Sequence, residues 1–257
     1  MRYARIETDQ GVRWAQFEDN TFRVLDNSPY DGGKPEVTEY SMDEVRVAAP
    51  VTPSKIFCVG RNYAAHRTEM GYRHDGSPSI FMKGPSAIIG PGENIVLPPT
   101  DMSTHVEHEA ELAFVIGRTA RHVAAADAAD YIFGYTCAND VSARDLQRSD
   151  PQLTRGKGFD TFCPVGPWLE TELDIDAGVR LSCTVNGELR QDASTAEMTY
   201  DIPFLMEYLS AFATLCPGDL VLTGSPGGTV LLHPGDTIDI EISGIGNLTN
   251  GVIAGRR

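Results

Sequence analysis

Residues 105–117 read HVEHEAELAFVIG and end as a strand that is apolar on both faces. In a strand, side chains two positions apart share a face, so Glu109 and Glu111 point the same way with α-carbons about 6.6 Å apart. Every position between them and the glycine is apolar, on either face: Leu112, Ala113, Phe114, Val115 and Ile116. A strand without a polar face is typical of a sheet interior. The chain therefore has to form a β-rich body that covers this strand on both sides.

Glu109 and Glu111 lie at the start of this apolar strand. Two carboxylates this close repel each other and resist ionisation unless a positive group lies between them. A divalent cation that prefers oxygen ligands (Mg²⁺, Mn²⁺ or Ca²⁺) would satisfy both. The alternative is that both glutamates lie at a solvated strand end, which is the commoner setting of an isolated E-x-E pattern.

A second polar group follows residues 135–140, which are predicted to form a short strand. Residues 141–147 have helical character, so Asp140 falls at the junction, and Arg144 and Gln147 follow on one helical face. A carboxylate, a cation and an amide aimed at one place suit a metal ion with an anionic ligand. The alternative is that Asp140 caps the helix and pairs with Arg144 four residues later. The residues alone leave both interpretations open.

Two glycine-rich segments carry polar groups that could approach a ligand closely. Lys157 lies between glycines in residues 155–162, and Thr223 and Ser225 lie in residues 222–228, where a strand ends in a turn. Backbone amides of such a turn can bind an anion, although the sequence matches no phosphate-loop pattern. The alternatives are an exposed loop lysine and ordinary turn chemistry.

A histidine–glutamate pair lies in residues 60–71. If this segment forms a short helix between its glycines, His66 and Glu69 share a face. A carboxylate beside an imidazole orients the ring and raises its basicity, as a general base requires. The alternative is an incidental pair on a surface helix.

The chain is predicted to be α+β and mainly β, with two parts. Residues 1–50 form a small N-terminal β subdomain, in which residues 3–7 and 12–17 alternate polar and apolar side chains. Residues 51–257 form the main body, with strands at 55–60, 112–117, 219–223 and 237–242 and a hairpin turn at Asn186 and Gly187. Helices are expected at 123–131 and 202–213. The strand–helix alternation of a Rossmann sheet is missing.

Charge and cysteine usage exclude several functional classes. The chain has 257 residues with a formal net charge of −15, which disfavours binding to nucleic acid or to an anionic membrane surface. No apolar run is long enough to span a membrane. The five cysteines form no C-x-x-C pair, so a disulfide framework is not expected. These features predict a cytoplasmic globular protein whose partner is neither nucleic acid nor a membrane.

Six motifs in this order resemble the fumarylacetoacetate hydrolase (FAH) family, and the likeness covers roughly residues 51–250. They are GRNY at 60–63, FMKGPS at 81–86, EAEL at 109–112, GY at 134–135 with NDVSARD at 139–145, RGK at 155–157 with FDTF at 159–162, and TGSP at 223–226. Several consecutive motifs at plausible separations make the resemblance specific. It implies a mixed β-sandwich roll of the type of the FAH C-terminal domain, usually a homodimer.

The resemblance also implies roles for individual residues. It implies one Mg²⁺ or Mn²⁺ held by Glu109, Glu111 and Asp140. His66 and Glu69 would be the acid–base pair on a mobile lid helix, and Lys157 would polarise a substrate oxygen. The positions matching substrate-binding residues are Arg61, Lys83, Arg144, Gln147, Thr223 and Ser225.

Two departures from the family pattern fall where substrate is expected. Leu153 stands where the family often has tryptophan, and Ser225 stands where the turn usually has threonine. Ser225 keeps the hydroxyl but lacks the methyl group. Both differences bear on the identity of the substrate rather than on the metal.

These features predict a metal-dependent enzyme acting on a small 2-oxo acid, a β-diketo or dicarboxylic acid, through an enolate that the cation and Lys157 stabilise. The main prediction is hydrolysis of a C–C bond of an acylpyruvate, with His66 and Glu69 activating water. Decarboxylation of the oxaloacetate type and isomerisation of the 2-hydroxyhepta-2,4-dienedioate type are alternatives, because they use the same enolate. From a different class, a non-catalytic protein could retain the metal as a stabilising element.

Overall fold

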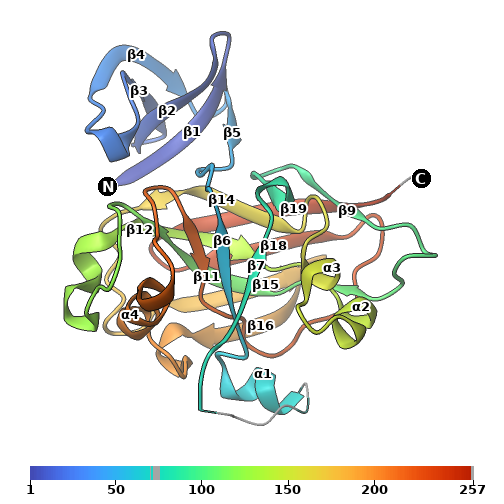
Figure 1. Cartoon of the computed structure of the whole chain (residues 1–257). Coiled ribbons are helices and arrows are strands. Elements are labelled where there is room, and N and C mark those ends of the chain that lie inside the picture. Colours follow the sequence, from blue (N-terminus) through green and yellow to red (C-terminus); the bar gives the residue numbers. More distant parts are fainter. Residues whose placement is uncertain (70, 72–75, 256–257) are drawn as a thin grey trace.

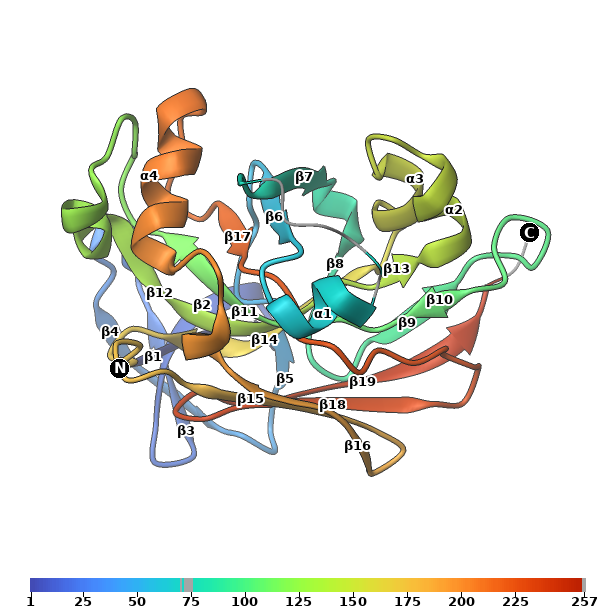
Figure 2. The same cartoon turned by 90° about the horizontal axis from the view of Figure 1, so that it is seen from below.

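A computed structural model describes residues 1–69, 71 and 76–255 of the chain (Figure 1). It is built mainly from strands, with few and short helices, which confirms the predicted α+β, mainly β class. Two large sheets face each other, so the predicted mixed β-sandwich is confirmed as well. In Figure 2, strands β15, β18 and β19 lie below the strands that carry the acidic residues.

The larger sheet follows the order β4-β3-β2-β1-β14-β12-β11-β17-β6-β7, with β5 paired to β1 and β8 paired to β14. Most neighbours are antiparallel, but β17 runs parallel to β6 and β8 parallel to β14. Its strands are β1 (Arg2–Thr8), β2 (Gly11–Glu18), β3 (Thr21–Leu25), β4 (Pro35–Ser41), β5 (Arg46–Ala48), β6 (Ile56–Gly60), β7 (Ser79–Lys83), β8 (Ile88–Ile89), β11 (Ala110–Ile116), β12 (Ile132–Asn139), β14 (Cys163–Glu170) and β17 (Leu220–Leu222).

The second sheet follows the order β16-β15-β18-β19-β9. A two-stranded pair, β10 with β13, lies beside the acidic residues. The strands are β9 (Asn94–Leu97), β10 (Val106–Glu107), β13 (Ser142–Ala143), β15 (Arg180–Val185), β16 (Glu188–Ser194), β18 (Thr237–Ile242) and β19 (Gly246–Ala254). Apolar side chains of both sheets merge into one buried cluster, which forms the core of the sandwich.

Strand β11 lies at the centre of the larger sheet, between β12 and β17. All seven of its residues are buried, on both faces. This confirms the interior position predicted from its sequence, because a strand covered on both sides has no need of a polar face. The strand is therefore a rigid support for the two glutamates at its start.

The N-terminal strands β1 to β5 continue the larger sheet rather than forming a separate one. Strand β1 pairs with β14 through Arg2 opposite Glu170 and Tyr3 opposite Leu169. Phe17 also stacks on Trp168 with a ring-centroid distance of 4.5 Å. In Figure 1 these strands stand at one end of the molecule. The boundary at residue 50 stays a prediction.

Two local predictions gave different outcomes. Asn186 and Gly187 have φ angles of 54° and 78°, as a type I′ turn requires, and they join β15 to β16. The predicted helix at 123–131 is present only from Ala125 to Tyr131, and it is a 3₁₀ helix, η3, rather than an α-helix. This segment buries only Ala128 and its N-terminus has no side-chain cap. With one buried residue and no cap, alanine propensity does not sustain an α-helix here.

The helices are short and lie around the edges of the sandwich (Figure 2). They are α1 (Ala64–Glu69), α2 (Arg144–Ser149), α3 (Thr154–Lys157) and α4 (Ile202–Phe212), with 3₁₀ turns η1 (Pro29–Asp31), η2 (Pro85–Ala87) and η4 (Thr195–Glu197). The predicted helix at 202–213 is thus present as α4. Helix α1 ends at Glu69, and Met70 lies outside the described residues. Among the described residues, no helix is both long enough and apolar enough to cross a membrane.

Candidate metal centre

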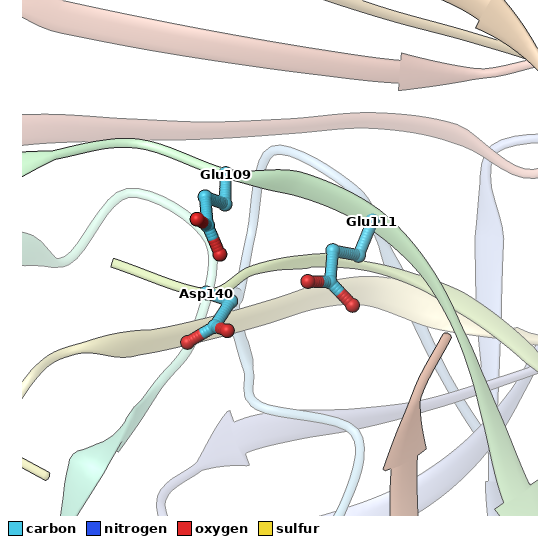
Figure 3. Close-up of side chains that lie close together, drawn as sticks. All are labelled: Glu109, Glu111 and Asp140. Atoms are coloured by element: carbon cyan, nitrogen blue, oxygen red, sulfur yellow. The ribbon is translucent and has the colours of Figure 1, made fainter. Parts of the chain in front are cut away.

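Glu109, Glu111 and Asp140 converge where β11 begins and β12 ends (Figure 3). The pairing of Ala110 with Asn139 brings the two strand ends together, and the Asp140 backbone N–H donates to the Glu109 carbonyl at 2.8 Å. One carboxylate oxygen of each residue lies within 4.8 Å of the others, and all three side chains are buried. The two glutamates share a face because they are two positions apart in sequence.

Three buried cations surround two of these carboxylates. Lys157 Nζ lies 2.6 Å from both Glu109 Oε2 and Asp140 Oδ2. Arg144 Nη1 lies 2.5 Å from Glu109 Oε1, and Lys83 Nζ lies 2.8 Å from Asp140 Oδ1. Burial alone would raise the pKa of Glu109, but Arg144 and Lys157 bring that pKa well below its usual value. Glu109 is therefore a carboxylate at neutral pH.

Glu111 differs from its two neighbours in its surroundings. Its Oε2 accepts a hydrogen bond from the Gly224 backbone N–H at 2.6 Å. Burial, and then the charges of Asp140 and Glu109, raise the pKa of Glu111 well above its ordinary value. A buried carboxylate that faces two others is stable as an anion only when a further positive charge is close.

The donor set fits a hard divalent cation. All the candidate ligand atoms are carboxylate oxygens, which Mg²⁺ and Mn²⁺ prefer. Asp140 Oδ1 already has an ammonium group beside it, because Lys83 Nζ lies 2.8 Å away. Glu111 accepts a backbone hydrogen bond, but no cationic side chain of the described residues is paired with it. Glu111 is thus the group that a cation would satisfy.

A tight turn after β17 supplies the hydrogen bond to Glu111. Gly224 in this turn has a φ of +106°, and a Cβ placed there would lie 2.6 Å from Asn62 Cβ. The Asn62 side chain is itself buried and bonded to the Thr223 and Tyr200 backbones. The position therefore requires glycine for both its backbone angle and its lack of a side chain.

Replacing Gly224 with alanine is expected to lower the free energy of unfolding by about 2 to 4 kcal/mol, from backbone strain plus crowding. Gly235→Ala is the matched control, because Gly235 has a φ of +98° but nothing within 4 Å of the place that a Cβ would occupy. Only the strain term, about 1 kcal/mol, is expected there. Urea unfolding of both variants measures the difference. Equal destabilisation would show that the close approach to Asn62 does not matter.

His66 lies on α1 and faces the acidic residues from the other side. It is 5% exposed, with Nδ1 at 3.3 Å from Glu69 Oε2 and Nε2 at 3.5 Å from Glu109 Oε1. Glu69 also accepts from the Gly228 backbone N–H at 3.1 Å, so it connects α1 to the glycine-rich turn. A proton on Nδ1 that is donated to Glu69 leaves the Nε2 lone pair pointing at the site, as a base requires.

A cavity of about 30 Å³ lies among these groups. That volume holds an ion or a water molecule but falls far below the usual size of a small-molecule pocket, about 300 to 1,000 Å³. A larger ligand can enter only if part of the wall moves. The lining residues are Val59, Gly60, Arg61, His66, Ser79, Phe81, Glu109, Glu111, Gln147, Leu153, Lys157 and Ser225.

The predicted substrate-binding residues divide into two groups. Arg61, Gln147 and Ser225 line the cavity. Arg144 does not line it, but donates to the Gln147 side chain at 2.9 Å. The Thr223 hydroxyl instead donates to the Leu112 carbonyl, and Lys83 donates to the backbone carbonyls of residues 141, 157 and 162. The substrate-binding roles stay predictions.

The structure corrects the arrangement predicted after β12. The helix begins at Arg144 rather than at residue 141, because Ser142 and Ala143 pair with β10 as strand β13. Arg144 pairs with Glu107 at 2.7 Å and with Glu109. The alternative in which Asp140 caps the helix and pairs with Arg144 is therefore wrong. Asp140 and Arg144 are both buried, so each needs opposite charges close to it. Long-range packing supplies these charges from other parts of the chain.

Sequence reasoning missed Glu107 and Gln191. Glu107 accepts from Arg144 and from the Thr229 hydroxyl, each at 2.7 Å. Its place two residues before Glu109 is a signal that could have found it. Gln191 is 1% exposed and reaches the site from β16 of the other sheet. No local pattern distinguishes it from the other residues of a hairpin strand.

Sequence comparison matches nearly the whole chain to known proteins. Residues 55–253 match the family described as fumarylacetoacetate (FAA) hydrolase C-terminal, and residues 1–50 match one described as Rv2993c-like, N-terminal. Protein Rv2993c of Mycobacterium tuberculosis is 47% identical, over 98% of each chain. Oxaloacetate tautomerase Fahd2a, mitochondrial, of Rattus norvegicus is 43% identical, over 82% of this chain and 70% of the relative.

Solved structures agree with this assignment. The 2-hydroxyhepta-2,4-diene-1,7-dioate isomerase from Mycobacterium marinum superposes with a TM-score of 0.91 at 44% identity, over the whole of both chains. Maleylpyruvate hydrolase from Sphingobium sp. SYK-6, in complex with manganese(II) ion and pyruvate, has a TM-score of 0.82 at 31% identity, also over the whole of both chains. With the sequence matches, these likenesses show that the chain is an enzyme of the fumarylacetoacetate hydrolase family.

Proposed function

We propose that the chain is a divalent-metal-dependent isomerase or tautomerase of a small 2-oxo dicarboxylic acid, which moves a proton at the carbon next to the 2-oxo group. The observation that carries this proposal is the buried His66, whose Nδ1 lies 3.3 Å from Glu69 Oε2 and whose Nε2 faces the acidic triad, 3.5 Å from Glu109 Oε1. A base at that place can reach a ligand bound at the triad.

Glu109, Glu111 and Asp140 would hold Mg²⁺ or Mn²⁺. The ion, when bound, supplies Lewis-acid stabilisation of negative charge on a substrate oxygen. The manganese and pyruvate named in the structure of maleylpyruvate hydrolase support both the metal and the class of ligand. The choice between the two ions belongs to the proposal as well.

Three side chains of the protein carry out the proton transfer and stabilise the negative charge that it creates. His66 Nε2 takes the proton from the carbon next to the 2-oxo group. It returns the proton to the enol oxygen in tautomerisation, or to a carbon further along the substrate in isomerisation, so protons balance in both reactions. Glu69 holds the ring orientation through Nδ1. Lys157, with its ammonium 2.6 Å from two triad carboxylates, places a second positive charge beside the developing enolate.

Isomerisation or tautomerisation is preferred over hydrolysis because of the relatives. The proteins named as oxaloacetate tautomerase and as isomerase are 43% and 44% identical to this chain, whereas the maleylpyruvate hydrolase is 31% identical. Hydrolysis of an acylpyruvate stays the second candidate, since the same histidine could activate water. A homodimer and a cytoplasmic location are further predictions carried over from the resemblance and the composition.

Production of pyruvate separates these reactions. With Mn²⁺ present, the protein should accelerate the loss of the enol absorbance of oxaloacetate without forming pyruvate. Decarboxylation of oxaloacetate or cleavage of an acylpyruvate would release pyruvate, which lactate dehydrogenase and NADH detect. A chelator should abolish turnover. Metal-dependent release of pyruvate at the rate of enol loss would favour the hydrolase or decarboxylase, and absence of turnover with any 2-oxo acid would contradict the proposal.

A further inference from the structure

Gln191 connects the second sheet to the wall of the cavity. Its side chain reaches from β16 to the larger sheet and makes four hydrogen bonds. Oε1 accepts from the Ala110 backbone N–H at 3.0 Å and from His108 Nδ1 at 3.1 Å. Nε2 donates to the Ser225 hydroxyl oxygen at 2.9 Å and to the Pro226 carbonyl at 2.7 Å. A buried amide with every bond satisfied is held in a single orientation.

The chemistry of its partners fixes which end of the amide faces the cavity. A backbone N–H can only donate, so the group that meets Ala110 must be the amide oxygen. A backbone carbonyl can only accept, so the group that meets Pro226 must be the amide nitrogen. Turning the amide over would break both bonds. Gln191 therefore always offers a donor to Ser225.

This donor determines what Ser225 can offer to a ligand. Since the Ser225 oxygen accepts from Gln191, its own hydrogen is available for another acceptor. The one acceptor found for it in the described chain is the Pro226 carbonyl at 3.3 Å. That distance is long for a hydroxyl hydrogen bond, and the same carbonyl already receives Gln191. Ser225 lines the cavity, where an anionic oxygen would be a better acceptor.

We infer that Gln191 is a positioning residue, which presents the Ser225 hydroxyl as a hydrogen-bond donor to an anionic oxygen of the 2-oxo acid. The inference rests on the proposed function, because it assumes that such an acid binds beside the triad. If Gln191 only holds β16 to the turn, its replacement would lower the stability of the protein. Its effect on ligand affinity would then be the same with or without the Ser225 hydroxyl.

A double-mutant cycle on ligand affinity distinguishes the two roles. The probe is oxalate, a planar mimic of a pyruvate enolate, titrated calorimetrically into protein saturated with Mn²⁺. Ser225→Ala and Gln191→Met should each weaken oxalate binding about 10- to 100-fold, as expected for a hydrogen bond to a charged group. In the Ser225→Ala background, Gln191→Met should change affinity by less than about twofold. Gln10→Met, the same change at an exposed glutamine of the β1–β2 turn, should have no effect.

Additive effects of the two substitutions would overturn the inference and leave the proposed function standing. Failure of the unaltered protein to bind oxalate with Mn²⁺ would overturn both. Mn²⁺ affinity, measured without oxalate, should stay within about threefold in every variant, which separates ligand contacts from metal loss.

Gln191→Glu serves if Gln191→Met does not fold. It keeps the shape and the acceptor for Ala110, but its second oxygen cannot donate to the Pro226 carbonyl and takes the Ser225 hydrogen instead. Ser225→Ala should then have no further effect in the Gln191→Glu background. Any direct effect of the added charge on oxalate is present in both backgrounds and cancels from the cycle. A full Ser225→Ala effect in that background would contradict the inference.

Discussion

Replacing Glu111 with glutamine is expected to weaken Mn²⁺ binding more than about 100-fold while raising the melting temperature of the metal-free protein. Altering a residue that only contacts a metal ligand typically lowers metal affinity about 10- to 100-fold, so losing a direct ligand should lower it further. Stability should change in the opposite direction because Glu111 is buried against the charges of Asp140 and Glu109, which raise its pKa. Glutamine removes that repulsion and can still accept from the Gly224 N–H.

Calorimetric titration with Mn²⁺ and thermal unfolding in a chelator measure the two quantities on one preparation. Glu241→Gln is a suitable control, because Glu241 is an exposed residue of β18 and the chemical change is identical. It should alter neither quantity. A Glu111→Gln protein that keeps its Mn²⁺ affinity would remove this residue from the metal site, and one that melts lower without metal would contradict the electrostatic account.

Replacing His66 with alanine is expected to lower turnover of the 2-oxo acid about 10²- to 10⁴-fold, the usual contribution of a general acid–base group. Mn²⁺ affinity should change by less than about threefold, because the three carboxylates remain. His66 Nε2 lies 3.5 Å from Glu109 Oε1, so the ring is beside the triad without belonging to it. Steady-state rates at saturating Mn²⁺ test the first expectation, and direct metal titration tests the second.

His233→Ala is a matched control for that substitution. His233 also faces a carboxylate three residues later, with Nδ1 at 3.7 Å from Asp236, but its side chain is 67% exposed. Its removal should leave both turnover and metal affinity unchanged. Normal turnover in the His66→Ala protein would exclude His66 from proton transfer, and loss of Mn²⁺ binding would show that the histidine supports the metal.

Features set by neighbouring residues were predictable from sequence. The burial of β11 on both faces follows from its run of apolar residues, and the shared face of Glu109 and Glu111 follows from their spacing. The turn at Asn186 and Gly187 likewise needs only the local preference for positive φ. In each case the signal lies within a few positions, where alternation and backbone preference decide the outcome.

Features set by long-range packing were not predictable from spacing. Arg144 is four residues from Asp140, yet it pairs with Glu107 and Glu109 because β10 and β13 bring those carboxylates to it. Gln191 comes from the opposite sheet and has no pattern at all. Only the family resemblance predicts that Asp140 shares a metal site with the two glutamates, because no local pattern indicates which strands are neighbours. Partner choice among buried charges depends on the finished fold.

The charges around the centre favour a cation beside Glu111. Glu109 and Asp140 have ammonium and guanidinium partners, whereas Glu111 has a backbone N–H and two like charges nearby. A divalent ion placed among the three would make all of them stable as anions. The function proposed here depends on that ion, because the base His66 acts only on a ligand held beside it.

Diffraction from crystals grown with Mn²⁺, recorded near the manganese absorption edge, tests this central claim most directly. The account predicts one strong anomalous peak, bound by oxygens of Glu109, Glu111 and Asp140 at about 2.0 to 2.6 Å. Lys157 should remain beside Glu109 and Asp140, close to the ion. An anomalous map without a peak among these three carboxylates, with Mn²⁺ present in excess, would contradict the account.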